Sequence, residues 1–216
     1  MKKMAAVLCM ILSMAVLFCA CSSSKQESKK ANTTTEENKE IKSSKKETTK
    51  TTETTKKRNK ILVAYFSWSG NTEKIAKIIA EDTGADLFKI ETKKAYTDDY
   101  DKLVDQAQEE KDNDIRPELK NKVKNFDQYE TVFLGYPIWW SDVPMAVNTF
   151  MESYNWEGKN VVPFCTHGGS AFGSSLTSVK NGAKKAKVLK GFEVEGSDAD
   201  NAKSDVLKWI KNLNLK

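Results

Sequence analysis

Nearly all the aromatic residues that could build a folded core lie after residue 60 of this 216-residue chain. That part holds the five tryptophans, the six tyrosines and eight of the nine phenylalanines. Aromatic side chains supply a large share of the apolar surface that a domain buries. Residues 61–216 are therefore expected to form one compact domain of ordinary size.

The net charge of +5 is distributed just as unevenly. Residues 1–21 contribute +2, residues 22–60 contribute +6 (12 basic against 6 acidic residues), and residues 61–216 contribute −3 (21 against 24). A basic chain can indicate nucleic-acid binding, but here the basic charge lies before the domain. Because the domain itself is mildly acidic, we expect no nucleic-acid partner.

Residues 1–20 are typical of an export signal, with Lys2 and Lys3 ahead of an apolar stretch that ends at Ala20. A retained membrane anchor is the alternative, although the stretch is at the lower limit of length for a spanning helix. Residues 17–24 resemble the lipobox of bacterial lipoproteins, which implies that Cys21 is lipidated. We therefore expect an exported lipoprotein of the cell membrane that faces the extracytoplasmic side.

Residues 21–60 form a disordered tether in this interpretation. Fifteen of the 39 residues from 22 to 60 are Ser or Thr, and so polar a segment cannot bury enough apolar surface to fold. With Cys9 and Cys19 removed and Cys21 acylated, Cys165 is the cysteine that remains in the domain. We expect it to be a small buried residue and not a nucleophile.

After residue 60, apolar runs alternate with amphipathic helical patterns, which is typical of a doubly wound α/β sheet. Strands are expected at 61–66, 87–90, 131–135, 160–165 and 188–194. Helices are expected after the turn at 67–72 as far as Gly84, and at 98–114, 144–151, 174–181 and 198–213. Pro163 is awkward within a central strand because it lacks an N–H donor. Ligands of such sheets bind beyond the carboxyl ends of the strands, which selects the loops after Phe66, Leu134 and Cys165.

The first of these loops combines hydroxyl and amide side chains with Gly70 at the start of a helix, which suits an anion. It lacks the glycine and lysine pattern of a nucleotide triphosphate loop and the glycine pattern of a dinucleotide fold. Ordinary helix capping is the alternative. We expect a terminal phosphate held by neutral donors.

The other two loops suit the rest of a ligand. Residues 135–144 include Trp139 and Trp140, which suit stacking on a flat aromatic group; closing the end of the sheet is the alternative. Residues 166–173 contain His167, the chain's one histidine, beside two glycines that let the backbone approach a ligand. A structural role for His167 is the alternative.

Residues 65–72 resemble the phosphate loop of flavodoxins, and residues 135–140 and 166–170 are similar to the two flavin-ring loops of a flavodoxin-like family. The match extends over residues 61–213. It implies a flavodoxin-like α/β fold, with a five-stranded parallel sheet of order 2-1-3-4-5 and helices on both faces. It also implies non-covalently bound FMN.

By motif position, the resemblance assigns three groups of contacts. The phosphate would be held by Ser67, Ser69, Gly70, Asn71 and Thr72, with Trp68 beside the ribityl chain. One edge of the flavin ring would be flanked by Pro137, Ile138, Trp139 and Trp140. The other edge would contact Thr166, His167, Gly168 and Gly169, and Tyr96 would approach the ring.

We therefore expect an FMN-dependent redox protein at the outer face of the cytoplasmic membrane, in which His167 tunes the flavin. Its partner would be a redox protein or a small-molecule electron acceptor. The alternative is an NAD(P)H- or quinol-dependent reductase of quinones or other small oxidised molecules, and a third possibility is a binding lipoprotein that has lost its cofactor. No metal site is expected, because one histidine and one remaining cysteine cannot make a zinc site.

Overall fold

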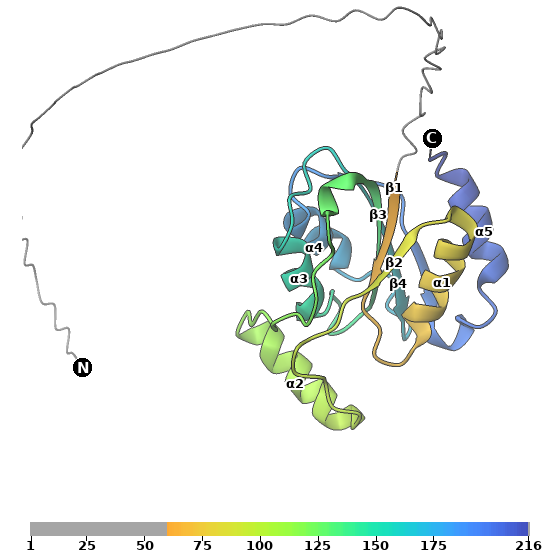
Figure 1. The fold of residues 1–216 in the computed structure, drawn as a ribbon. Coiled ribbons are helices and arrows are strands. Elements are labelled where there is room, and N and C mark those ends of the chain that lie inside the picture. Colours follow the sequence, from red (N-terminus) through yellow and green to blue (C-terminus); the bar gives the residue numbers. More distant parts are fainter. Residues whose placement is uncertain (1–59, 216) are drawn as a thin grey trace, which may run out of the picture. The chain divides into compact units, whose positions relative to one another are not determined.

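The structure is a computed structural model that describes residues 60–215. The predicted export signal (1–20), the lipidated Cys21 and the tether (21–60) lie outside the described residues, apart from Lys60. The described part is a parallel sheet with helices packed on both faces (Figure 1).

The sheet is built from the apolar runs of the sequence. Its strands are β1 (Lys60–Tyr65), β2 (Asp86–Lys89), β3 (Tyr129–Pro137), β4 (Asn160–His167), β5 (Lys187–Val188) and β6 (Phe192–Glu195). They run in the order β2-β1-β3-β4-β5, all parallel, and β6 also pairs with β4. The predicted order 2-1-3-4-5 is thus confirmed.

The five α-helices follow the predicted positions closely. They are α1 (Asn71–Thr83), α2 (Tyr100–Asp112), α3 (Met145–Glu152), α4 (Ser175–Gly182) and α5 (Lys203–Asn212). Two short 3-10 helices are η1 (Phe126–Gln128) and η2 (Gly196–Asp198). The last helix starts later than predicted, because η2 and a turn rich in Asp and Asn occupy residues 196–202.

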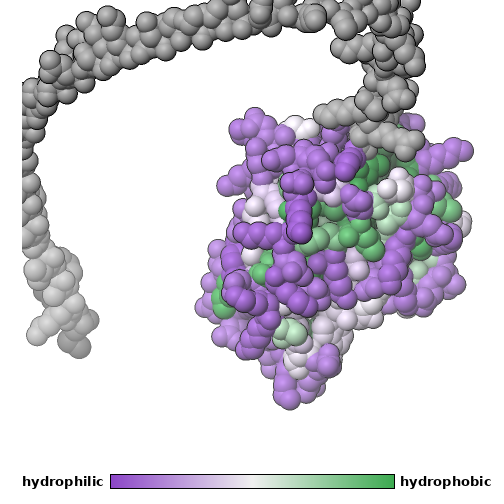
Figure 2. All heavy atoms as spheres, in the orientation of Figure 1, coloured by the Kyte–Doolittle hydropathy of each residue, from purple (hydrophilic) through white to green (hydrophobic). Residues whose placement is uncertain are grey.

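Two separate cores hold the helices on the sheet. On one face, Ile75 and Ile79 of α1 pack with Val206 and Trp209 of α5, and on the other Phe150 of α3 packs beside α4. Polar side chains cover most of the face shown in Figure 2, with smaller apolar patches between them. Within residues 60–215, no helix is long and apolar enough to cross a bilayer.

The fifth strand differs from the prediction, and Pro163 explains why. The run 188–194 is split into β5 and β6, which pair with the two ends of β4. The carbonyl of Val161 accepts from the N–H of Leu189 at 2.8 Å, so the backbone groups of Val161 point from β4 toward β5. Because backbone direction alternates along a strand, those of Pro163 point to the same side of β4. The missing donor of Pro163 therefore faces the interruption between β5 and β6, where no strand pairs with Pro163 on this edge.

Helix α2 lies past the end of the sheet at which β1 finishes, unlike the helices that cover the faces (Figure 1). Leu103 and Ala107 are buried on its inner side. Its position brings α2 to the carboxyl ends of the strands, where the predicted ligand loops lie.

Candidate functional site

The three predicted loops meet at the carboxyl edge of the sheet. The hydroxyls of Thr72 and Thr166 are 2.8 Å apart and buried, which joins the first loop to the third. The N–H of Ile138 donates to the carbonyl of Thr166 at 2.9 Å, and the rings of Phe66 and Trp139 are 5.3 Å apart. The sequence-predicted site residues therefore lie together, as the order β1-β3-β4 requires.

The start of α1 has the features of an anion site. Gly70 precedes the helix with a φ of 89°, a conformation that favours glycine, and its position provides no side-chain cap. Thr72 is paired with Thr166 and so does not cap the helix either. The first-turn N–H groups of this 13-residue helix therefore lack the capping side chain that the alternative interpretation required.

The hydroxyl of Ser67 is the strongest indication of a missing ligand. Within residues 60–215, it is the one buried side-chain oxygen or nitrogen without a hydrogen-bond partner. A buried unpaired hydroxyl costs about 1–3 kcal/mol. Because Ser67 lies three residues before Gly70, in the loop that leads to the uncapped helix start, a phosphate oxygen there would satisfy both groups.

The side chains of Trp68 and Asn71, in the same loop, contact residues outside the loop. The indole N–H of Trp68 donates to the carbonyl of Thr97 at 2.9 Å, and its ring lies 6.2 Å from that of Tyr100. Asn71 lies against Gly196, where a Cβ would come within 2.9 Å of the Asn71 amide nitrogen. Ser69 is exposed. The loop around Gly70 is thus fixed at both ends.

An aromatic cluster lies next to this loop. Phe66, Tyr96 and Trp139 are in mutual edge-to-face contact, with ring centroids 5.2–5.6 Å apart. This geometry is favourable for aromatic pairs. The cluster places Tyr96 against Trp139 of the predicted flavin-flanking loop, and its approach to the ring itself stays a prediction.

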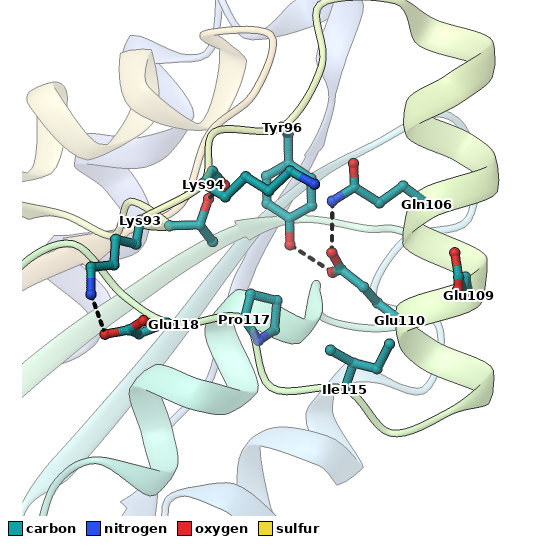
Figure 3. A pocket seen from close by; sticks show the side chains of 10 residues that line it. Lys93, Lys94, Tyr96, Gln106, Glu109, Glu110, Ile115, Pro117 and Glu118 are labelled. Atoms are coloured by element: carbon teal, nitrogen blue, oxygen red, sulfur yellow. Dashed lines mark hydrogen bonds and ion pairs between the residues drawn. The ribbon is translucent and has the colours of Figure 1, made fainter.

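Glu110 of α2 holds Tyr96 in this cluster (Figure 3). Its carboxylate accepts from the Tyr96 hydroxyl at 2.7 Å and from the Gln106 amide at 2.9 Å, and the residue is only 6% exposed. Burial, and then this hydrogen bond, raise the pKa of Tyr96. Glu110 is not among the predicted site residues, although its spacing from Leu103 and Ala107 places it on the same inner side of the helix.

Trp140 and Ser141 form a strained turn. The backbones of Trp139 and Asp142 exchange two hydrogen bonds of 2.9 Å, and the two residues between them have φ values of 48° and 61°. Non-glycine residues rarely adopt this conformation, which costs about 1–3 kcal/mol each.

Hydrogen bonds to α2 and to Ser174, the residue before α4, keep that turn in place. Lys111 of α2 donates to the Trp140 carbonyl at 2.5 Å, and the Trp140 indole N–H donates to the Val104 carbonyl at 3.1 Å. On the other side, the N–H and hydroxyl of Ser174 both donate to the Ser141 carbonyl. The turn in the predicted ring loop is therefore bonded on both sides, to α2 and to Ser174.

His167 is fixed by two hydrogen bonds. Its Nδ1 accepts from the N–H of Gly169 at 3.0 Å, and its Nε2 pairs with the carboxylate of Glu193 on β6. Because Nδ1 accepts, the proton lies on Nε2 and is donated to Glu193. The sequence did not indicate Glu193, because the pairing depends on the register between β4 and β6.

Cys165 is buried beneath this loop, as predicted. Burial, and then the charge of Glu193, raise the pKa of its thiol. A thiol in this state is a poor nucleophile. Among residues 60–215, no group of three or more His, Cys, Asp or Glu side chains could hold a metal ion.

Comparisons with known proteins agree with this geometry. The flavodoxin family model matches residues 60–213. A crystal structure from Bacteroides eggerthii, assigned to the flavoproteins, is 34% identical with a TM-score of 0.63, covering 73% of this chain and 99% of that one. A similar protein from Bacteroides uniformis is 32% identical with a TM-score of 0.64, covering 71% and 98%. No curated protein matches the chain.

A flavoprotein from Lactobacillus acidophilus, solved in complex with FMN, shares the fold. It is 23% identical, has a TM-score of 0.55, and covers 66% of this chain and 97% of its own. The family model covers residues 60–213, which is nearly all of the predicted domain and includes the three loops that meet at the sheet edge. The chain therefore belongs to the flavodoxin family.

Proposed function

We propose that this protein binds FMN without a covalent bond and transfers electrons at the outer face of the cytoplasmic membrane. The observation that carries the proposal is the buried, unpaired hydroxyl of Ser67 beside the uncapped start of α1. The FMN bound by the Lactobacillus acidophilus flavoprotein supports the choice of cofactor.

The residues present fit this cofactor. Ser67, Gly70 and the first-turn N–H groups of α1 would hold the phosphate. The dipole of α1 favours negative charge at this end of the helix. The turn that contains Trp139 and the loop that contains His167 would flank the ring. Bound FMN would supply the electron-transfer chemistry, while the protein sets the environment of its ring.

Two features of the chain would shape that environment. Phe66, Tyr96 and Trp139 form an uncharged aromatic cluster beside the predicted ring loop. His167 holds its proton at Nε2 through Glu193, and a role for His167 in tuning the cofactor stays a prediction.

Replacing Ser67 with alanine tests the phosphate site. Ser67→Ala should weaken FMN binding about 10- to 100-fold, because a hydrogen bond to a charged group contributes about 1.5–3 kcal/mol. The stability of the cofactor-free protein should stay the same or rise, because the variant removes a buried unpaired hydroxyl. Quenching of flavin fluorescence on titration measures the affinity, and urea unfolding measures the stability.

Two controls make this experiment specific. Riboflavin lacks the phosphate, so its affinity should be equal in the wild type and in Ser67→Ala. Ser204→Ala, the same change at an exposed position of α5, should leave FMN binding unaltered. If Ser67→Ala binds FMN as tightly as the wild type, the phosphate lies elsewhere.

The location and partners form the second part of the proposal. The lipobox resemblance at Cys21 supports an exported protein anchored by lipid, which would meet a redox protein or a small-molecule acceptor at the membrane. Stable attachment of a protein to a membrane requires more than one acyl chain, and the lipidated cysteine of a lipoprotein carries more than one.

Cys21→Ser should move the protein from the membrane fraction to the soluble fraction when it is expressed in a bacterium. Labelled fatty acid should be incorporated into the wild type and not into this variant. Cys165→Ser is the matched control, because Cys165 is buried in the fold and should not affect fatty-acid labelling. Labelling that persists in Cys21→Ser would reject the assignment.

A further inference from the structure

Two buried threonine hydroxyls face each other between the first and third loops of the site. Thr72 lies in the first turn of α1 and is 1% exposed, and Thr166 lies near the end of β4 and is 4% exposed. Their Oγ1 atoms are 2.8 Å apart, and either hydroxyl can be the donor. Each hydroxyl carries one proton, and only one of the two protons can lie between the oxygens. The other proton has no acceptor among the hydrogen bonds of residues 60–215.

We propose that Thr166 is a positioning residue for a bound phosphate group: its hydroxyl donates to Thr72, and the Thr72 hydroxyl donates to a phosphate oxygen at the start of α1. The inference rests on the proposed function, under which this phosphate is that of FMN. It gives the Thr166 side chain a different task from the ring contact that the family resemblance assigns to it. Three observations lead to it: the direction of the side chain, the number of hydroxyl protons, and the pairing of the nearby charges.

The alternation of side chains along β4 directs Thr166 toward α1. Phe164, two residues earlier, belongs to the core beneath α1 and α5, whereas Cys165 belongs to the core on the other face of the sheet. Because the side chains of a strand alternate between the two faces, Thr166 points to the same face as Phe164. The carbonyl of Thr166 accepts from the N–H of Ile138 at 2.9 Å, so its backbone joins the ring loop while its hydroxyl meets α1.

The hydroxyl protons of the site exceed the acceptors that the protein provides. Ser67, Thr72 and Thr166 carry one hydroxyl proton each, and within residues 60–215 only the bond between the threonines uses any of them. A buried donor without a partner is costly, so two protons need an acceptor from outside the chain. A phosphate oxygen is such an acceptor, and a hydroxyl that itself accepts a hydrogen bond donates more strongly. A relay from Thr166 through Thr72 therefore gives a stronger contact than Thr72 would make alone.

The charged side chains at the start of α1 are engaged elsewhere. Lys74 is paired with Asp200 at 2.8 Å. The carboxylate of Glu73 is paired with Lys77 at 2.6 Å and with Lys89 at 3.2 Å. Because the cation of this first turn already has a partner, a phosphate there depends on N–H and O–H donors, which makes each hydroxyl count.

The affinities of the full chain for FMN and for riboflavin test the relay. Thr166→Val keeps the shape of the side chain and removes its hydroxyl. It should weaken FMN binding about three- to tenfold, as expected for one hydrogen bond, and leave riboflavin binding unchanged. Thr166→Ser restores the hydroxyl and should bind FMN within about twofold of the wild type. An equal loss for riboflavin and FMN would place the hydroxyl at the ring and overturn the proposal.

A double-mutant cycle distinguishes a relay from two separate contacts. Thr72→Val should weaken FMN binding about 10- to 100-fold, because it removes the hydrogen bond to the charged group. In a relay, adding Thr166→Val to Thr72→Val should cause no further loss. Losses that multiply would mean that Thr166 contacts the ligand by itself, and the relay would be wrong. Thr131→Val is the matched control, because Thr131 is 5% exposed near the start of β3, toward the opposite end of the sheet, and should not affect FMN binding.

Inorganic phosphate separates this inference from the proposed function. In the cofactor-free full chain, the amide signals of Gly70 and Asn71 in a proton–nitrogen correlation spectrum should shift saturably as phosphate is added. Thr166→Val should raise the dissociation constant for phosphate about three- to tenfold. If it does so but FMN does not bind the wild type, the inference stands and the proposed function fails. If FMN binds the wild type and Thr166→Val alters neither affinity, the proposed function stands and the inference is wrong.

Discussion

Raising the pH from about 8 to about 11 should lower the free energy of unfolding by about 5 kcal/mol. A loss of this size approaches the total stability of many domains. The largest contributions come from three buried acidic groups, the phenols of Tyr96 and Tyr136 and the thiol of Cys165, and the buried phenol of Tyr65, whose pKa rises to about 12, adds to them. Burial is the main cause that raises the pKa of each in the folded protein.

The sign of the effect follows from proton binding. In the unfolded chain a tyrosine ionises near pH 10 and a cysteine near about pH 8.5. The folded protein keeps all three protons through this range, so it binds more protons than the unfolded chain does. Stability therefore falls as the pH rises above about 8.5, and each group contributes up to about 1.4 kcal/mol per pH unit.

Urea unfolding at a series of pH values measures this loss. Above pH 10, Tyr136→Phe should make the fall in the free energy of unfolding less steep by about 1.4 kcal/mol per pH unit. The Ser175 hydroxyl, which faces Tyr136, keeps its bond to the Phe172 carbonyl at 2.6 Å in this variant. Tyr100→Phe, at an exposed side chain, should leave the steepness unchanged. Equal pH profiles of the wild type and Tyr136→Phe would contradict the explanation.

The fold could be predicted from sequence because its central strands are buried on both faces. Such strands appear as continuous apolar runs, which identified β1, β3 and β4. The split of the fifth strand could not be predicted, although Pro163 was recognised as a difficulty. The sequence does not tell toward which neighbouring strand the backbone of Pro163 faces, and that direction decides where the sheet is interrupted.

The candidate site could be predicted only as far as local motifs describe it. The three loops were found because their residue types and their places after strands agree. Glu110 was missed because eight acids in the range 98–114 suggested a solvated face, which hid its inward position. The turn at Trp140 and Ser141 could not be found either, because neither residue type favours a positive φ.

Gly135→Ala should destabilise the protein by about 3 kcal/mol, although the change adds one methyl group. A Cβ at this position would overlap the ring of Phe164, which lies beside Gly135 across β3 and β4. Phe164 is fully buried in the core beneath α1 and α5, so its ring has little space to move. The Gly135 carbonyl also accepts from the N–H of Phe66 at 2.9 Å, directly before the phosphate loop.

A double-mutant cycle with Phe164→Leu tests whether this overlap is the cause. Phe164→Leu alone should cost about 1–2 kcal/mol, and the double variant should be more stable than the sum by at least about 1 kcal/mol. Gly168→Ala is the matched control, since a Cβ there would meet nothing within 4 Å, and its stability in cofactor-free protein should be nearly unchanged. Additive costs in the cycle would mean that the Phe164 ring does not limit Gly135. A double variant that is more stable than the sum of the single costs would support the conclusion that Gly135 leaves space for the Phe164 ring between β3 and β4, next to the loops of the site.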